Sequence, residues 1–379
     1  MGLKSNKRIL LAKLEDTYGV DPTPTGSDAM LVGNLEVNPL AAELVRRNPI
    51  RPYFGISDTL IAQSSGAIAF EIELAGAGIR GNAPAWAPLL KACGFAQTLN
   101  TVSIAIAVAT EVATVTKATH GRLVGESVVI SGCTDTALNG TFVIATVPTA
   151  NTFTYAAAGA SDDVSADGTP VMRDTCSFAP ISSSLPSIAF YYNLDGVLHK
   201  MLGARGSVEF TINVKNIPVM KFTFVSLYSA PIDAAAATPD FTGFQQPKVA
   251  NTSNTTAFSI FSYSGLLEQV NLNMAVGVEF RALIGEESVI ISDRQPSGNM
   301  VIEATTVAQK DFFSLARAGT KGALTITHGT ANGNKVTLAA PQVSIGNPSY
   351  QDSQGTQMLN IPISATPSSG NDEVVITAA

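Results

Sequence analysis

The chain has 379 residues, enough for two or three domains, and only 14% of them are charged. Hydrophobic residues make up 45% of the chain, a content that excludes a disordered protein. The net charge of −7 and the lack of a dense Lys/Arg cluster argue against a protein that grips nucleic acid, because phosphate binding needs positive charge.

Apolar stretches long enough for a membrane span or a secretion signal are not found. The apolar stretch 102–109 falls far short of the roughly 20 residues that a transmembrane helix needs. At the N-terminus, the apolar patch 9–12 is followed directly by charged residues, which is too short for a signal-peptide core. We therefore expect a protein that neither enters a membrane nor is exported.

A glycine-rich motif, GAGIRG at residues 76–81, lies between a predicted strand over 67–74 and a predicted helix. A dinucleotide-binding fold uses such glycines to bring a pyrophosphate to a helix N-terminus, and it needs an acidic residue about 20 positions later. No Asp or Glu occurs between Glu73 and Glu111, and the strand alternates apolar with charged residues. We interpret the motif as a flexible strand-to-helix loop and not as a nucleotide site.

The helix after this loop is the first of two short helices that the sequence predicts. Asn82 can cap it, Pro84 suits its first turn, and Gly94 ends it. Its expected apolar face consists of Trp86, Leu89, Leu90 and Cys93.

Residues 100–174 differ from their surroundings, because they are rich in Thr, Ala and Val and carry three cations against seven anions. Strands are expected over 102–117, 127–131, 141–147 and 152–156, with a turn at Asn139-Gly140 and a loop over 159–168. The segment begins after one apolar strand and ends before another, so we predict an inserted small β domain. Residues 1–99 and 175–379 then form one discontinuous core domain.

Strand patterns dominate the second half of the chain. Residues 207–215 alternate apolar and polar side chains with the period of two that a half-buried strand requires. After a turn at 216–218, the strand over 219–228 has two largely apolar faces, so its own domain or a neighbouring chain should cover both. Hairpins with glycine in the turn are predicted for 188–193 with 197–202, 288–292 with 299–303, and 324–328 with 335–340.

The second helix is predicted over 307–318, where Thr306 and Gln309 form a capping box and Gly319 follows the last turn. The fold class is therefore all-β, a sandwich or barrel with two short helices.

No cluster of residues suggests catalysis, cofactor binding or metal binding. His120, His199 and His328 are isolated from one another and from carboxylates, so we expect ordinary turn or surface histidines. The cysteines are widely spaced and are expected to be buried reduced thiols: Cys93, Cys133 and Cys176.

A long, charge-poor, strand-rich chain without a reactive site is typical of a building block. Open sheets carry unpaired edges, and self-assembly can pair each edge with the next subunit. If such head-to-tail contacts close, a sheet continued around the ring becomes one large barrel with a lumen.

Several stretches point to a family: RILLAKLEDTYGVDPTPT at 8–25, then 70–78 with 83–94, 206–228, 290–296 and 324–341. In this order they resemble the major tail tube proteins of long-tailed, siphovirus-type bacteriophages. The resemblance covers roughly 1–98 and 175–379. Residues 120–155 resemble a small β module that recurs in phage structural proteins.

The resemblance implies a structural virion protein with no enzymatic activity, assembled in the host cytoplasm. Subunits would form hexameric rings that stack into the tail tube, with the inserted domain on the exterior. DNA would pass through the lumen during ejection without specific binding. The implied partners are further copies of the chain and the tape measure, tail completion and tail tip proteins.

An acidic lumen wall would repel DNA phosphates and keep the genome from sticking. Glu71, Glu73 and Glu209 alternate with apolar residues on predicted strands and are candidates for this wall, with an exterior position as the alternative. Another virion part, such as a decoration or receptor-binding protein, is the competing interpretation, in which residues 100–174 would be the binding element.

Overall fold

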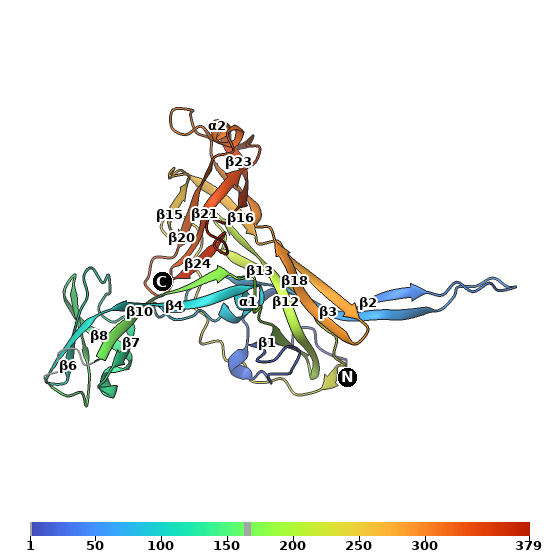
Figure 1. Cartoon of the computed structure of the whole chain (residues 1–379), viewed down its shortest axis with the longest axis horizontal. Helices are drawn as coiled ribbons and strands as arrows, with labels where there is room; N and C mark the ends of the chain where they lie inside the picture. The colour runs from blue at the N-terminus through green and yellow to red at the C-terminus, as the bar shows by residue number, and fades with distance from the viewer. Residues whose placement is uncertain (1, 163–167) are drawn as a thin grey trace.

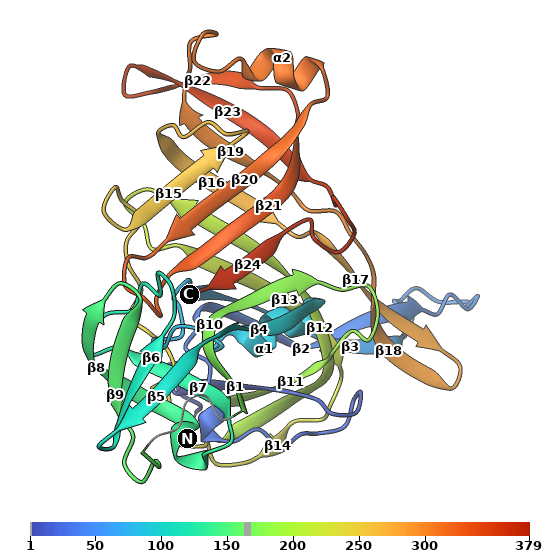
Figure 2. The ribbon, with the colours of Figure 1, turned by 60° about the vertical axis from the view of Figure 1, so that its left-hand side comes forward.

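The computed structural model describes residues 2–162 and 168–379. Strands make up most of this part of the chain, and its two α-helices are short: α1 (Ala87–Ala92) and α2 (Phe312–Arg317). The prediction of an all-β fold is confirmed (Figures 1 and 2). Within the described residues, no helix is long and apolar enough to cross a membrane.

The body of the molecule is built from two antiparallel sheets. The first sheet runs, in spatial order, through β2 (Gly33–Arg46), β3 (Thr59–Glu73), β13 (Val219–Leu227), β12 (Val197–Asn213), β16 (Leu267–Asn273), β19 (Ser297–Glu303) and β23 (Thr356–Ala365). The second runs through β15 (Thr255–Ile260), β20 (Lys321–His328), β21 (Val336–Ile345), β24 (Val375–Ala378), β10 (Gly168–Pro180) and β4 (Phe95–Ser103). β21 also pairs with β23, which joins the two sheets at one side.

Smaller elements extend this framework. The first half of β12 continues beyond the sandwich and pairs with β11 (Ile188–Leu194) and β14 (Ile232–Asp233), while β1 (Arg8–Leu14) pairs with β11. β22 (Ser349–Ser353) pairs with the first half of β23. Two short 3₁₀ turns lie at Gly26–Asp28 and Thr136–Leu138.

The main core lies where alternating residues of the strands point inward, as the period of two in the sequence predicts. At its centre, the rings of Phe70, Phe190, Phe222 and Phe224 pack with centroids 4.8–6.0 Å apart. Burying large apolar side chains in this way is the main source of stability in such a fold. The other face of β13 is only partly covered within the chain, which leaves room for the neighbour that the sequence suggests.

The segment between β4 and β10 forms the lobe at the left of Figure 1. Its strands are β5 (Ala105–Ala109), β6 (Val112–Thr116), β7 (Ser127–Cys133), β8 (Gly140–Thr149) and β9 (Thr152–Ala156). These strands enclose a hydrophobic cluster separate from the main core, with Val115, Phe153 and Tyr155 fully buried. The predicted strand over 102–117 is in fact the end of β4 followed by β5 and β6, because Thr110 and Glu111 take the positive φ angles of a tight hairpin turn. Of the predicted loop over 159–168, residues 163–167 lie outside the described residues.

Of the three predicted hairpins, two are present in the structure and one is not. The β11–β12 and β20–β21 hairpins are confirmed. The predicted pairing of 288–292 with 299–303 is wrong: β18 (Glu286–Arg294) pairs with β17 (Val276–Leu283) as a separate ribbon, and β19 pairs with β16 and β23. A side chain on Gly298 would lie 2.0 Å from the carbonyl oxygen of Asn271, so this glycine serves close strand packing and not chain reversal.

Both helices are shorter than the sequence predicts. α1 starts after Trp86, and no side chain caps its first turn, so the predicted cap at Asn82 is wrong. Before the helix, the Pro84 carbonyl accepts from the Ala87 amide in a separate turn. α2 starts after Asp311, whose carboxylate accepts from the Ser314 amide at 2.9 Å. The side chain of Gln309 does accept from Thr306, as a capping box would suggest, but this contact closes an isolated turn.

Candidate assembly surfaces

One face of the first sheet is polar and open to solvent. Glu71 of β3, Lys221 of β13 and Glu209 of β12 lie side by side in one row across three strands. Glu73 is one pleat further along β3, and Glu36 of β2 faces the same side because it pairs with Ala69. Around this row the face carries four carboxylates and one ammonium group, and it brings together all three of the predicted wall candidates. Further away on the same face lie Arg205 of β12, which donates to the Val289 carbonyl, and Glu303 of β19.

Neighbouring amides hold two of these carboxylates in place. Asn271 Nδ2 donates to Glu209 Oε1 at 2.5 Å, and Asn34 Nδ2 donates to Glu71 Oε2 at 2.6 Å. Hydrogen bonds to ionised oxygens are stronger than bonds between neutral groups. These bonds therefore restrict the side chains of Glu209 and Glu71. Glu36 was missed from the sequence because its strand was not predicted.

A long arm formed by β2 and β3 projects from the body, at the right of Figures 1 and 2. At its tip, the side chains of Ile50 and Phe54 are fully exposed, at 103% and 106% of their reference areas. Ile56 and Tyr53 are also exposed. An apolar patch of this kind, at the end of an extension with no core of its own, is typical of a surface that another chain covers.

Covering the tip would be strongly favourable. Full burial of an isoleucine or phenylalanine side chain contributes roughly 1.5–3 kcal/mol, so Ile50, Phe54 and Ile56 together provide several kcal/mol toward association. The arm tip therefore offers apolar surface that a second chain could bury.

Several strands have an open edge in the described structure, and β2 and β15 are two of them. Across the described ranges, 2–162 and 168–379, β3 is the one strand that pairs with β2, and β20 is the one strand that pairs with β15. At the end of β15, Ile260 also forms a bridge with Tyr263. The β17–β18 ribbon also projects from the body, and Ile284 at its turn is fully exposed. Unpaired edges of this kind are templates for pairing with another chain.

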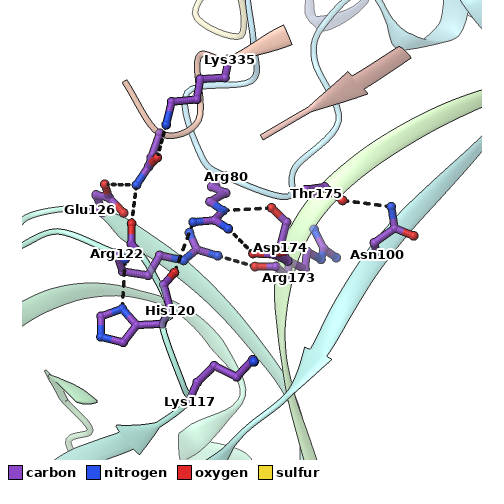
Figure 3. A network of polar contacts seen from close by, with 12 residues as sticks. Arg80, Asn100, Lys117, His120, Arg122, Glu126, Arg173, Asp174, Thr175 and Lys335 are labelled. Carbon is purple, nitrogen blue, oxygen red and sulfur yellow. Dashed lines mark hydrogen bonds and ion pairs between the residues drawn. The ribbon is translucent and has the colours of Figure 1, made fainter. Parts of the chain in front are cut away.

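A polar network joins the lobe of β5–β9 to the body (Figure 3). Arg80, in the loop before α1, forms an ion pair with Asp174 of β10 at 2.6 Å and donates to the His120 carbonyl at 3.3 Å. Asn332, in the β20–β21 turn, donates to Glu126 at 2.8 Å and accepts from Lys335 at 3.0 Å. These contacts tie the lobe to two separate loops of the body.

Arg122 lies at the centre of this network, and its side chain is buried. Nη2 donates to the carbonyl of Arg173, and the Arg122 amide donates to His120 Nδ1 at 3.0 Å. Burial, together with the nearby charge of Arg80, lowers the pKa of Arg122 to about 10. The guanidinium is still charged at neutral pH, and Nε and Nη1 have no hydrogen-bond partner in the described structure.

The glycine-rich motif at 76–81 is a loop, as predicted, but it is tightly packed. The Gly78 amide donates to the Gly333 carbonyl at 2.8 Å, and a side chain on Gly76 would lie 2.3 Å from the same oxygen. The Gly76 amide donates to the side chain of Asn334 at 2.6 Å. The glycines therefore allow two backbone segments to touch, and the loop's amides are used within the chain.

The histidines do not gather into a site, and two are less exposed than expected. His120 and His328 are buried and hydrogen-bonded, His120 to Thr149 and His328 to Thr255 and Lys248, which corrects the expectation of surface positions. Cys93 and Cys176 are buried, Cys133 is half-buried, and all three are free thiols. In the described part of the chain, no group of three or more His, Cys, Asp or Glu side chains is arranged to hold a metal ion.

The polar sheet face, the apolar arm and the open strand edges are features of a structural protein that assembles with other chains. A family model for phage tail tube proteins matches residues 5–375. The chain therefore belongs to the phage tail tube protein family, and it is a structural component of a phage tail. No curated protein matches the chain.

Proposed function

We propose that the chain forms rings that stack into the tail tube, through which DNA leaves the virion during ejection. The observation that carries this proposal is the β2–β3 arm, because its fully exposed Ile50 and Phe54 need cover that the chain itself does not provide. Rings of six subunits are what the family resemblance implies. The protein acts without enzymatic activity, and assembly takes place in the host cytoplasm.

The polar face of the first sheet is the best candidate for the wall of the lumen. Four carboxylates against one ammonium group would give the wall a negative potential that repels DNA phosphates. The opposite face of the same strands is buried in the core. The ribbon of β17 and β18 contacts the polar face at Ser207, so the part around Glu209 is the part that would meet the DNA.

The lobe of β5–β9 is proposed to be a separate inserted domain, within the predicted boundaries 100–174, on the tube exterior. Its own hydrophobic cluster supports this division, and so does its position on the side of the body away from the arm (Figure 1). Tape measure, tail completion and tail tip proteins are the expected partners at the lumen and at the tube ends.

Negative-stain microscopy of the concentrated purified protein tests the proposal. We expect tubes of one constant diameter from the wild-type chain. A variant in which residues 43–63 are replaced by an Asn-Gly turn, which removes the arm tip, should stay folded and form no tubes. Globular monomers or trimers of the wild-type chain under every salt and pH condition would contradict the proposal and favour a decoration or receptor-binding protein.

A further inference from the structure

The sandwich is open on the side away from the arm, where a groove of about 510 Å³ separates the two sheets. Its walls are β15 of the second sheet and the ends of β12 and β16 of the first. Apolar side chains line it, with Val214 and Leu266 exposed on the rim and Phe258 and Leu267 half-buried inside.

The free edge of β15 forms one border of this groove. On its other side β15 pairs with β20, and on the groove side the backbone of Ile260 is already used by Tyr263. The stretch of β15 before Ile260 therefore has the backbone groups that a further strand could pair with. An apolar groove beside an open edge suits an extended segment, because the backbone can pair with the edge while alternate side chains enter the groove.

The charge of the groove indicates what kind of segment fits. Of the side chains that line it, the one ionisable group is the carboxylate of Glu268. Its Oε1 accepts from Ser353 at 3.4 Å, and its Oε2 is buried with no hydrogen-bond partner in the described structure. A buried carboxylate oxygen without a partner is costly, and a cationic group would relieve that cost.

The arm tip has the matching composition. Residues 46–58 contain three arginines and one aspartate, and the apolar side chains of Ile50, Phe54 and Ile56 stand exposed between them. The tip is thus a loop that is apolar and net positive, which complements a groove that is apolar and negative.

The positions of arm and groove require two copies of the chain. In both Figure 1 and Figure 2, the arm leaves the body on the right and β15 lies on the left, so an arm points away from its own groove. Complementary surfaces on opposite sides of one subunit give a head-to-tail contact that repeats from copy to copy.

Two other pockets of similar volume, about 600 and about 480 Å³, fit the tip less well. The smaller one is lined by Lys7 and Arg8, whose charge has the same sign as that of the tip. The larger one lies at the base of β18. One oxygen of its Glu373 has no hydrogen-bond partner in the described structure, as in Glu268, but Glu373 already has a cationic partner in Arg294.

From these observations we infer that the groove beside β15 receives the arm tip of a second copy of this chain. The inference rests on the proposed self-assembly and adds the site at which neighbouring subunits hold one another.

Disulfide cross-linking between two variants tests this contact. In a Cys133→Ser background, a chain with Phe54→Cys is mixed in equal amounts with a chain carrying Ala257→Cys, whose side chain lines the groove and is exposed. The matched control replaces the second partner by Ala282→Cys, which is exposed on the β17–β18 ribbon. All mixtures are assembled, oxidised and separated on non-reducing gels.

We expect a cross-linked dimer in the Phe54→Cys and Ala257→Cys mixture, at a yield at least about tenfold above either variant alone and above the control. Tubes that form without this cross-link, or with an equal yield from the Ala282→Cys control, would overturn the groove assignment alone. Failure of the wild-type chain to form tubes would overturn the proposed function, and the groove contact with it.

Discussion

At the scale of single residues, a small charged cluster fastens the N-terminal segment to the body. Lys200 Nζ lies 2.8 Å from Asp21 Oδ2, and the hydroxyl of Tyr191 donates to Asp21 Oδ1 at 2.6 Å. Partial burial raises the pKa of Asp21, but the hydrogen bonds from Lys200 and Tyr191 outweigh it and leave this pKa below its ordinary value. The cluster therefore links folding to the ionisation of one carboxyl group.

The variant Asp21→Asn tests this link. Because the pKa is lower in the folded state, the carboxylate stabilises the fold above the unfolded pKa of about 3.9, and this contribution is lost as the pH falls through the folded value. We expect the variant to lose at most about 1 kcal/mol of unfolding free energy at pH 7, since solvent screens the pair. The loss should be smaller at pH 3, because pH 3 lies below the unfolded pKa.

Urea unfolding at pH 7 and pH 3 measures both values. Asp233→Asn, at an exposed position on β14, serves as the control and should change the unfolding free energy at pH 7 by less than about 0.5 kcal/mol. If Asp21→Asn loses the same free energy at both pH values, its side chain acts by packing and not by charge.

At the scale of elements, two loops distant in sequence meet through their backbones. Gly333, in the β20–β21 turn, has a φ of +81°, and a side chain there would lie 2.3 Å from the carbonyl oxygen of Gly78. Gly370 has a similar φ of +94° but nothing within 4 Å of the added atom. Both positions need a residue that tolerates a positive φ, but only Gly333 also needs room for a close backbone contact. Comparing substitutions at the two positions therefore distinguishes the two effects.

Alanine at each position should reveal the difference. Gly370→Ala is expected to cost about 1–2 kcal/mol, from the strained backbone conformation alone. Gly333→Ala should cost at least about 3 kcal/mol, because the loops must also move apart. Equal losses in urea unfolding would mean that the contact between the loops adds nothing to stability.

The sequence predicts those elements whose pattern is local. The alternation in 207–215 and the turns at Asp195-Gly196 and Asn332-Gly333 identify their strands and hairpins correctly. The β17–β18 ribbon is missed, because the Pro-Ser-Gly stretch at 296–298 looks like a turn and is in fact where the chain enters the first sheet.

The assembly surfaces are only partly predictable for a related reason. Glu71 and Glu209 are 138 positions apart, and only the pairing of β3, β13 and β12 brings them into one row. The arm was not predicted, because its strands do not pack on a core. Residues 33–61 therefore lack a face of regularly buried side chains. The alternation of apolar and polar residues along a strand indicates which side chains are buried within one chain. It says little about surfaces that are buried only when another chain binds.

At the scale of the whole molecule, the lobe of β5–β9 and the body each have their own hydrophobic cluster. Replacing 104–170 by an Asn-Gly turn joins Ser103 to Val171, which already pair across β4 and β10. The change Met172→Ser removes one apolar side chain that the lobe covers. We expect a soluble chain that forms tubes of smaller outer diameter, because the body keeps its own core.

Circular dichroism and negative-stain microscopy check this outcome. A chain that is insoluble, or that folds and forms no tubes, would show that the lobe is part of the structure that assembles. Arg80→Met in the full-length chain is a useful comparison, because it removes the ion pair with Asp174 and keeps the lobe.

The pairing of β4 with β10 has a practical consequence. The lobe enters and leaves the body through two adjacent strands, so its ends lie side by side. Any foreign domain whose termini are close together has the geometry to take its place, and each subunit would then present one copy at a regular spacing. A particle of this kind would be a genetically encoded display lattice.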